Sequence, residues 1–269
     1  MALLTFYGDD SGKDNKTNVA VAGYVSDKPR WDAFGYRWQK LLDEEGVEVF
    51  HRTDMEGPPY HGEFKDWTKP RMKRVLREAH RIIRAARMRG WGNSVRVKAW
   101  RQIFPKSLKT VFGGTYGWCA DACVTGVAKW ANANDHWVTY IFEAGTKGRD
   151  EVDIAMKSLF NNPKDREKYR IADWGFAPKK GQGSGIQLQA ADFIAYETFK
   201  YIDNQVAEGM RRKYRISARH LLDDQKDRVM YWGDDDLMQR LVNATEKSEI
   251  APLLKPDVRI VKHRSQPEL

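Results

Sequence analysis

The sequence predicts an α/β fold, in which helices flank a β-sheet. Two observations lead to this prediction. Short runs of apolar and β-branched residues have the length of strands, and the longer segments between them carry apolar residues at helical spacing. The chain has 269 residues, of which 41% are hydrophobic, so it can bury one large core. We therefore expect a folded domain rather than a disordered chain.

Strands are expected where a short run is mostly β-branched, aromatic or small and is bounded by polar residues. They are predicted at Leu3–Tyr7, Asn18–Val25, Val47–Phe50, Gly92–Trp100, His136–Phe142 and Tyr169–Phe176. A polar loop separates the first two runs, which is consistent with a β-hairpin.

Helices are expected where apolar residues recur every three or four positions. They are predicted at Trp31–Glu45, Thr68–Met88, Tyr116–Asn132, Asp150–Phe160 and Ile186–Ala207. The chain beyond residue 207 is polar and mixed in charge. We therefore place one domain at residues 1–207, and a peripheral helical extension packed on the same domain at residues 208–269.

The charge of the chain points to polyanionic partners. The formal net charge is +9, which favours nucleic acid over other partners. The helix predicted near residues 68–88 is amphipathic, and the polar side carries basic residues almost alone: Arg71, Lys73, Arg74, Arg77, Arg81, Arg84 and Arg87. This face is either a surface that contacts phosphates or an ordinary solvated face.

Several classes of protein are not expected. Cys119 and Cys123 are too few for a disulfide framework, and we expect them to be reduced and buried. The N-terminal residues have no basic flank followed by a long apolar run, so no signal peptide is predicted. No apolar run approaches the roughly 20 residues that cross a bilayer. We expect a cytoplasmic protein with no membrane partner.

Four acidic residues stand where secondary elements end or pack. Asp9 and Asp10 follow the first predicted strand, and Glu143 follows the strand predicted at His136–Phe142. Asp192 interrupts an apolar stretch of the last predicted helix. A carboxylate on the buried side of a helix is costly unless it is paired, capped or bound to a metal.

Carboxylates at the ends of two strands and on one helix can converge at one edge of a sheet. Such a set of oxygen ligands suits Mg²⁺ or Mn²⁺. One or two such ions can activate water and stabilise the leaving oxygen when a phosphodiester bond is hydrolysed. The sequence therefore predicts a metal-dependent nuclease acting on DNA or RNA.

Three short motifs resemble the domain-of-unknown-function 3800 family. They are the opening FYGDDSG, the segment FHRTDM and the helical segment IQLQAADFIAYETF, and together they span roughly residues 3–205. Asp10 stands where that family usually has Glu. The resemblance implies an RNase H-like mixed sheet flanked by helices and a metal-dependent nuclease, with a link to phages or mobile elements. The basic helix near 68–88 is then an insertion.

The resemblance also implies roles for individual residues. Asp9 is the first metal ligand, and Glu143 and Asp192 complete the site. Asp10 is either a further ligand or a residue that orients one.

Two more residues of the second motif join this set. Asp54 matches a further metal ligand. His51 is either a general base or a phosphate contact, since an imidazole near neutrality can do both. A hydrogen-bonded histidine with no role in chemistry is the alternative.

Other functions remain open at this point. A nucleic-acid- or protein-binding module could keep the fold without the chemistry. Asp10-Ser11-Gly12 matches the aspartic-protease triplet, but that chemistry would require a symmetric dimer because the chain has no second triplet. The run GQGSG at 181–185 is expected to be a flexible link. Most tryptophans are expected in the core, and Trp67, Trp100 and Trp174 are the better candidates for exposed residues that could stack on bases.

Overall fold

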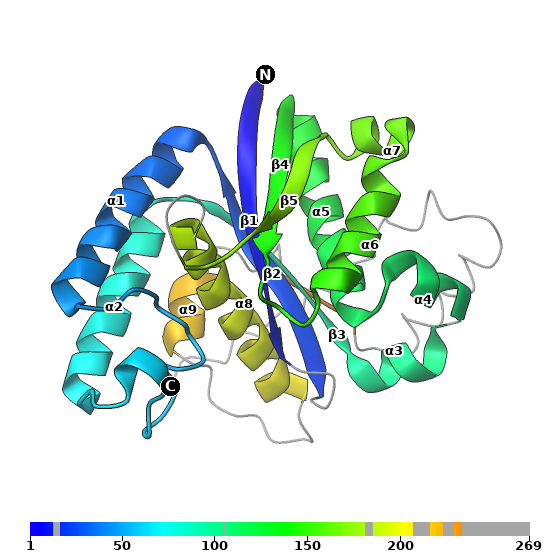
Figure 1. Ribbon diagram of the computed structural model, residues 1–269. Helices are drawn as coiled ribbons and strands as arrows, with labels where there is room; N and C mark the ends of the chain where they lie inside the picture. Colours follow the sequence, from blue (N-terminus) through cyan, green and yellow to red (C-terminus); the bar gives the residue numbers. More distant parts are fainter. Residues whose placement is uncertain (13–16, 105, 181–184, 207–215, 223–228, 233–269) are drawn as a thin grey trace, which may run out of the picture.

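A six-stranded mixed sheet forms the centre of the molecule (Figure 1). The computed structural model describes residues 1–12, 17–104, 106–180, 185–206, 216–222 and 229–232. The strands are β1 Ala2–Gly12, β2 Asn18–Ser26, β3 Arg89–Arg96, β4 His136–Glu143, β5 Ile171–Ala177 and β6 Val229–Trp232. Their order across the sheet is β5-β4-β1-β2-β3-β6.

The sheet combines an antiparallel meander with parallel additions. Strands β1, β2 and β3 pair antiparallel in chain order. Strand β4 lies parallel to β1, and β5 lies parallel to β4. The predicted α/β fold with a mixed sheet flanked by helices is confirmed, and so is the β1–β2 hairpin.

Helices cover both faces of the sheet (Figure 1). One layer contains α1 Lys28–Glu45, α2 Lys69–Ala85, α8 Gly185–Val206 and α9 Ile216–Leu222. The other contains α3 Val97–Ile103, α4 Lys106–Phe112, α5 Thr115–Ala133, α6 Arg149–Phe160 and α7 Pro163–Lys168. A short 3-10 helix, η1, spans Gly62–Phe64. None of the helices described here is long and apolar enough to cross a membrane.

Each layer has its own hydrophobic core. Phe6, Val95 and Tyr140 lie on the sheet face that α5 and α6 cover. Trp38 and Phe193 belong to the core on the opposite face, where α1 and α8 meet. Because side chains alternate along a strand, consecutive residues of β1 enter different cores. This alternation decides where the acidic residues point.

The strand predicted at Val47–Phe50 is wrong, since this segment is an irregular loop. Its backbone N–H groups are bound by side chains instead of by another strand. Glu63 accepts from the N–H of Glu48 at 2.8 Å, and Gln189 on α8 accepts from the N–H of Phe50 at 3.0 Å. The predicted strand Gly92–Trp100 is also shorter, because α3 begins at Val97.

The described parts of the C-terminal extension lie on the same domain. Helix α9 packs against α8 and α2, and β6 pairs with β3 and thereby adds a strand to the sheet. The prediction of a helical extension missed this strand. The prediction for residues 181–185 lies almost wholly outside the described residues.

Candidate functional site

The acidic residues of β1 and β4 meet at one end of the sheet. The two strands run parallel, with Gly8 opposite Phe142, so Asp9 and Glu143 follow at the same level. Helix α8 packs on β1 and brings Asp192 to this end. The carboxyl ends of parallel strands are where ligands bind in many α/β proteins.

Asp9 and Asp192 share one cation, the ammonium of Lys179. The Lys179 Nζ atom lies 2.7 Å from Asp9 Oδ2 and 3.5 Å from Asp192 Oδ1. Asp9 and Asp192 are both buried, with 2% and 3% of their surface exposed. We call these three residues the inner cluster. Lys179 follows β5, and sequence reasoning missed it; its only signal is its place between a strand end and a Gly-rich run.

The backbone of the loop before η1 holds Asp192 on its other side. The N–H of Arg52 donates to Asp192 Oδ2 at 2.7 Å. A carboxylate in an apolar helix was expected to need partners, and this one has a lysine and a backbone N–H.

Arg52 is itself buried, although no sequence pattern predicts this. Its guanidinium donates to Glu197 on α8 at 2.9 Å and to Glu56 at 3.2 Å, and it lies 4.5 Å from the centre of the Tyr196 ring. These contacts fix the loop against α8 one turn beyond Asp192. Arg52 therefore positions the loop that carries His51 and Asp54.

His51 and Asp54 pair with each other at the more exposed rim of the site. His51 Nδ1 lies 3.2 Å from Asp54 Oδ2, and 43% and 32% of their side chains are exposed. Within the described residues, no ion pair or hydrogen bond joins Asp54 to Asp9 or Asp192. The structure thus places Asp54 as a partner of His51, next to the inner cluster rather than in it.

Asp10 and Glu143 line a small cavity with Thr146. The cavity has a volume of about 10 Å³, which is the size of one water molecule. Burial raises the pKa of Asp10 to about 6, although the hydrogen bond from Thr146 and the charge of Lys179 oppose this rise, while Glu143 adds to it. We call Asp10 and Glu143 the outer pair.

The surroundings also shift the pKa of Asp9 in the inner cluster. Burial raises the pKa of Asp9 well above its ordinary value, and the Lys179 ammonium acts in the opposite direction. The Asp9 Oδ2 atom faces the Lys179 ammonium, whereas the buried Asp10 Oδ1 atom has no hydrogen-bond partner among the described residues. A buried carboxylate oxygen without a donor is the kind of group that a bound cation satisfies.

These residues fit a divalent ion in chemistry but are not gathered around one point. Within the part of the chain that the structure describes, no group of three or more His, Cys, Asp or Glu side chains lies close enough to hold a metal ion. The oxygen donors Asp9, Asp10, Glu143 and Asp192 are of the type that Mg²⁺ and Mn²⁺ prefer. The cation present between two of them is Lys179.

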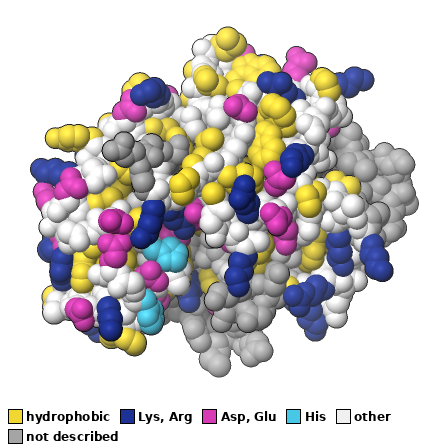
Figure 2. Space-filling model, viewed as in Figure 1, with side chains coloured by type: hydrophobic (Ala, Val, Ile, Leu, Met, Phe, Trp, Pro, Cys, Tyr) yellow, Lys and Arg dark blue, Asp and Glu magenta, His cyan; other side chains and the backbone are white. Residues whose placement is uncertain are grey.

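The basic face of α2 is less free than its sequence suggests. Arg71 and Arg74 both bind the buried carboxylate of Glu45, at 3.1 and 2.7 Å. Arg81 pairs with Glu78. The exposed basic residues outside these pairs are Lys73, Arg77, Arg84 and Arg87. At the left of Figure 2, over α1 and α2, basic and acidic side chains are mixed.

The expected stacking tryptophans are only partly accessible. Trp100 is 4% exposed and packs in the core beside Phe104, so the prediction that it is exposed is wrong. Trp67 and Trp174 are half-buried. Trp174 lies on edge strand β5, next to Phe176, which lines the small cavity.

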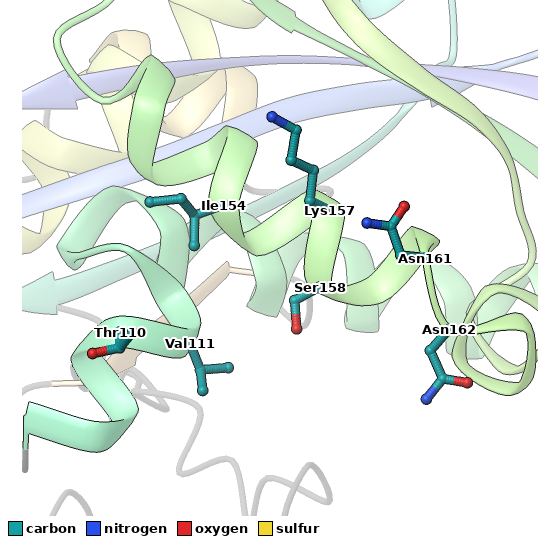
Figure 3. A pocket seen from close by; sticks show the side chains of 7 residues that line it. All are labelled: Thr110, Val111, Ile154, Lys157, Ser158, Asn161 and Asn162. Atoms are coloured by element: carbon teal, nitrogen blue, oxygen red, sulfur yellow. The ribbon is translucent and has the colours of Figure 1, made fainter.

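A larger hollow lies between α4 and α6 and shares no lining residue with the acidic site (Figure 3). Its volume is about 570 Å³, and it is lined by Val111 and Ile154 with polar neighbours such as Lys157 and Asn161. It contains no cluster of acids or histidines. The chemistry of the molecule is therefore concentrated at the end of the sheet.

Comparison with known proteins adds no relative: no family model matches the chain, and no curated protein matches it.

Proposed function

We propose that this protein is a nuclease that hydrolyses phosphodiester bonds in DNA or RNA with the help of one or two Mg²⁺ or Mn²⁺ ions. The observation that carries the proposal is the meeting of Asp9, Asp10, Glu143 and Asp192, from three distant parts of the chain, at one end of the sheet. Three separate elements each deliver an acid to the same place, which a structural role alone does not require.

The topology supports an RNase H-like fold for this site. An antiparallel meander of three strands is extended by two strands parallel to its first member, which is what we expect of such a sheet. The acids lie in the C-terminal part of β1, at the end of β4 and on α8, which agrees with the resemblance to the domain-of-unknown-function 3800 family.

In this proposal the four acids hold the metal, which supplies an activated water and stabilises the leaving oxygen. Asp9 and Asp192 are the inner ligands, while Asp10 and Glu143 are the outer ones. Because Asp9 and Asp10 point to opposite faces of β1, the ligand set forms around the end of the strand.

His51 acts on the substrate side. Its Nδ1 atom faces Asp54, so Nε2 is left to contact a phosphate or accept a proton from water. The role of Asp54 in this proposal is to orient the imidazole, which differs from the direct metal ligation expected from its motif. The exposed position of His51 makes it reachable by a polynucleotide.

A second candidate is a nucleic-acid- or protein-binding module without catalysis. Lys179 already neutralises part of the acidic charge, and the described acids are not gathered around one point, which favours this reading. We propose the cytoplasm as the location of the protein, and nucleic acid is the first partner to test for both candidates.

The first test is Mn²⁺ binding by calorimetry, comparing wild type with Asp9→Asn. We expect micromolar-to-millimolar binding that is lost in the variant, because Asp9 is the central ligand. Asp32→Asn is the matched control, since Asp32 lies on the exposed side of α1 and pairs with Lys28. Thermal unfolding checks that each variant is folded.

Cleavage is then measured on labelled single- and double-stranded DNA, RNA and an RNA–DNA hybrid. Asp9→Asn and Asp192→Asn should lose all metal-dependent cleavage. Full activity in both variants would contradict the proposed function, and so would metal binding that Asp9→Asn leaves unchanged. Nucleic-acid binding without Asp9-dependent metal binding would select the non-catalytic module.

A further inference from the structure

We propose that Lys179 is a residue of this site, whose ammonium occupies a cation position between Asp9 and Asp192 and is displaced from it when a divalent ion binds. The inference rests on the proposed function, because it concerns the same carboxylates. It assigns a role in this site to a residue that none of the three sequence motifs contains.

The geometry singles out Lys179 from its neighbour. Its ammonium lies 2.7 Å from Asp9 Oδ2 and 3.5 Å from Asp192 Oδ1, and only 13% of its side chain is exposed. Lys180 comes next in the chain, yet its side chain is 69% exposed and lies 3.6 Å from the exposed carboxylate of Glu48. Two adjacent lysines of one loop thus have opposite environments.

Burial explains why a cation is needed here. Two carboxylates that approach each other in a dry site repel, and each loses its hydration. Burial lowers the pKa of Lys179, but the charges of Asp192 and Asp9 outweigh burial and raise it above its ordinary value. Glu143 acts in the same direction. Lys179 is therefore held as an ammonium by the acids that it neutralises.

The same position cannot hold two cations. A divalent ion bound by Asp9 and Asp192 would need the oxygens that now face the ammonium, and the two positive charges would repel at close range. Lysine has a flexible four-carbon stem, so its head group can leave without a change in the backbone.

The direct test is calorimetric titration of Mn²⁺ at pH 8 into wild type, Lys179→Met and Lys180→Met. Methionine keeps much of the stem and removes the charge. We expect Lys179→Met to bind Mn²⁺ roughly ten-fold more tightly, equivalent to about 1.4 kcal/mol, because no ion pair has to be broken. Lys180→Met loses the same charge from the next residue and should bind like wild type.

A second test needs no substitution. Wild-type protein is treated briefly with an amine-acylating reagent, with and without Mn²⁺, and modification at each lysine is quantified by mass spectrometry. Metal should increase acylation of Lys179 several-fold, because its ammonium leaves the inner cluster. Acylation of Lys180 should stay constant and serves as the internal control.

The outcomes separate this inference from the proposed function. Asp9-dependent Mn²⁺ binding with unchanged or weaker affinity in Lys179→Met, or with unchanged acylation of Lys179, overturns the inference alone. No Mn²⁺ binding in wild type or in Lys179→Met overturns both. Tighter binding in Lys179→Met together with metal-dependent acylation of Lys179 supports both.

Discussion

Two charged regions of this protein differ in how completely their charges are paired. Along the buried side of α8, Asp192 meets Lys179 and the N–H of Arg52, and Glu197 meets the Arg52 guanidinium. On the outer face of α2, Arg71 and Arg74 share the single carboxylate of Glu45, while other arginines face solvent.

The difference follows from desolvation. A buried charge without a partner costs several kcal/mol. Asp192 and Glu197 are buried, and each lies beside a basic side chain. An exposed charge keeps its water and needs no partner. The buried network therefore marks one defined place in the fold, whereas the exposed charges of α2 define no single site. Three substitutions test this distinction.

The largest effect is expected for Arg52→Met. Removing this guanidinium breaks its ion pair with Glu197, a residue with 0% exposure, and should lower the free energy of unfolding by about 3 to 5 kcal/mol. Unfolding in denaturant measures this loss in the free energy of unfolding. Arg81→Met removes an exposed pair with Glu78 and should leave the midpoint nearly unchanged.

The double variant Arg52→Met/Glu197→Leu sharpens this test. Removing both charges should recover much of the lost stability, since the Glu197 carboxylate is then absent together with the Arg52 guanidinium that pairs with it. A double variant as unstable as Arg52→Met would show that the loss comes from packing, and the comparison between the two regions would fail.

Asp10→Asn is expected to raise the free energy of unfolding, whereas Arg52→Met should lower it. The folded pKa of Asp10 is about 6, above its ordinary value, so the folded protein holds this proton more tightly and wild-type stability falls as the pH rises from roughly 4 to 6. The amide should raise the free energy of unfolding at pH 8 by about 1 to 3 kcal/mol and have little effect near pH 3.5.

Unfolding curves of wild type, Asp10→Asn and Asp32→Asn at both pH values measure this gain. Asp32 is exposed on α1, and its substitution should show no such pH dependence. A loss of stability in Asp10→Asn at pH 8 would mean that the Thr146 hydrogen bond outweighs the burial of the charge.

The smallest effect on stability is expected on α2. The triple variant Lys73→Gln, Arg77→Gln and Arg84→Gln should unfold almost like wild type, because these side chains are exposed. If the face contacts phosphates, the salt dependence of DNA or RNA binding, log K against log salt, should become shallower by up to about 3.

A control triple keeps the change in net charge equal. Lys28, Lys40 and Lys157 are exposed and each pairs with an acid four residues away, so replacing them with Gln should leave the salt dependence intact. Equal effects of both triples would show that only net charge matters.

Residues whose position follows from local patterns were predicted well. Asp9 follows the apolar run Leu3–Tyr7, Glu143 ends an apolar strand, and Asp192 interrupts an apolar helical stripe, so each stood out in sequence. The first strand is longer than predicted, because β1 continues past Asp9 to Gly12 in its ladder with β2. The alternation along β1 and the spacing in α8 carry this information within a few residues. The long helices α1, α2, α5, α6 and α8 and most strands were predicted for the same reason, whereas the short helices α3, α4 and α7 were missed.

Residues whose position depends on distant packing were not predicted. Lys179 and Arg52 lie in loops, where a basic residue ordinarily faces water, and only the approach of α8 buries them. The loop at Val47–Phe50 resembles a strand in composition, but side chains of Glu63 and Gln189 take its hydrogen bonds. No local pattern reports such long-range partners.

The peptide bond between Asp9 and Asp10 is all that separates the two halves of the site. The N–H of Asp10 donates to Asp9 Oδ1 at 2.8 Å, and both residues are held in the ladder with β2, opposite Ala22 and Val21. A change in the backbone of β1 that moves one of these residues toward a ligand therefore moves the other as well. The strand thus couples the two faces of the sheet at this site.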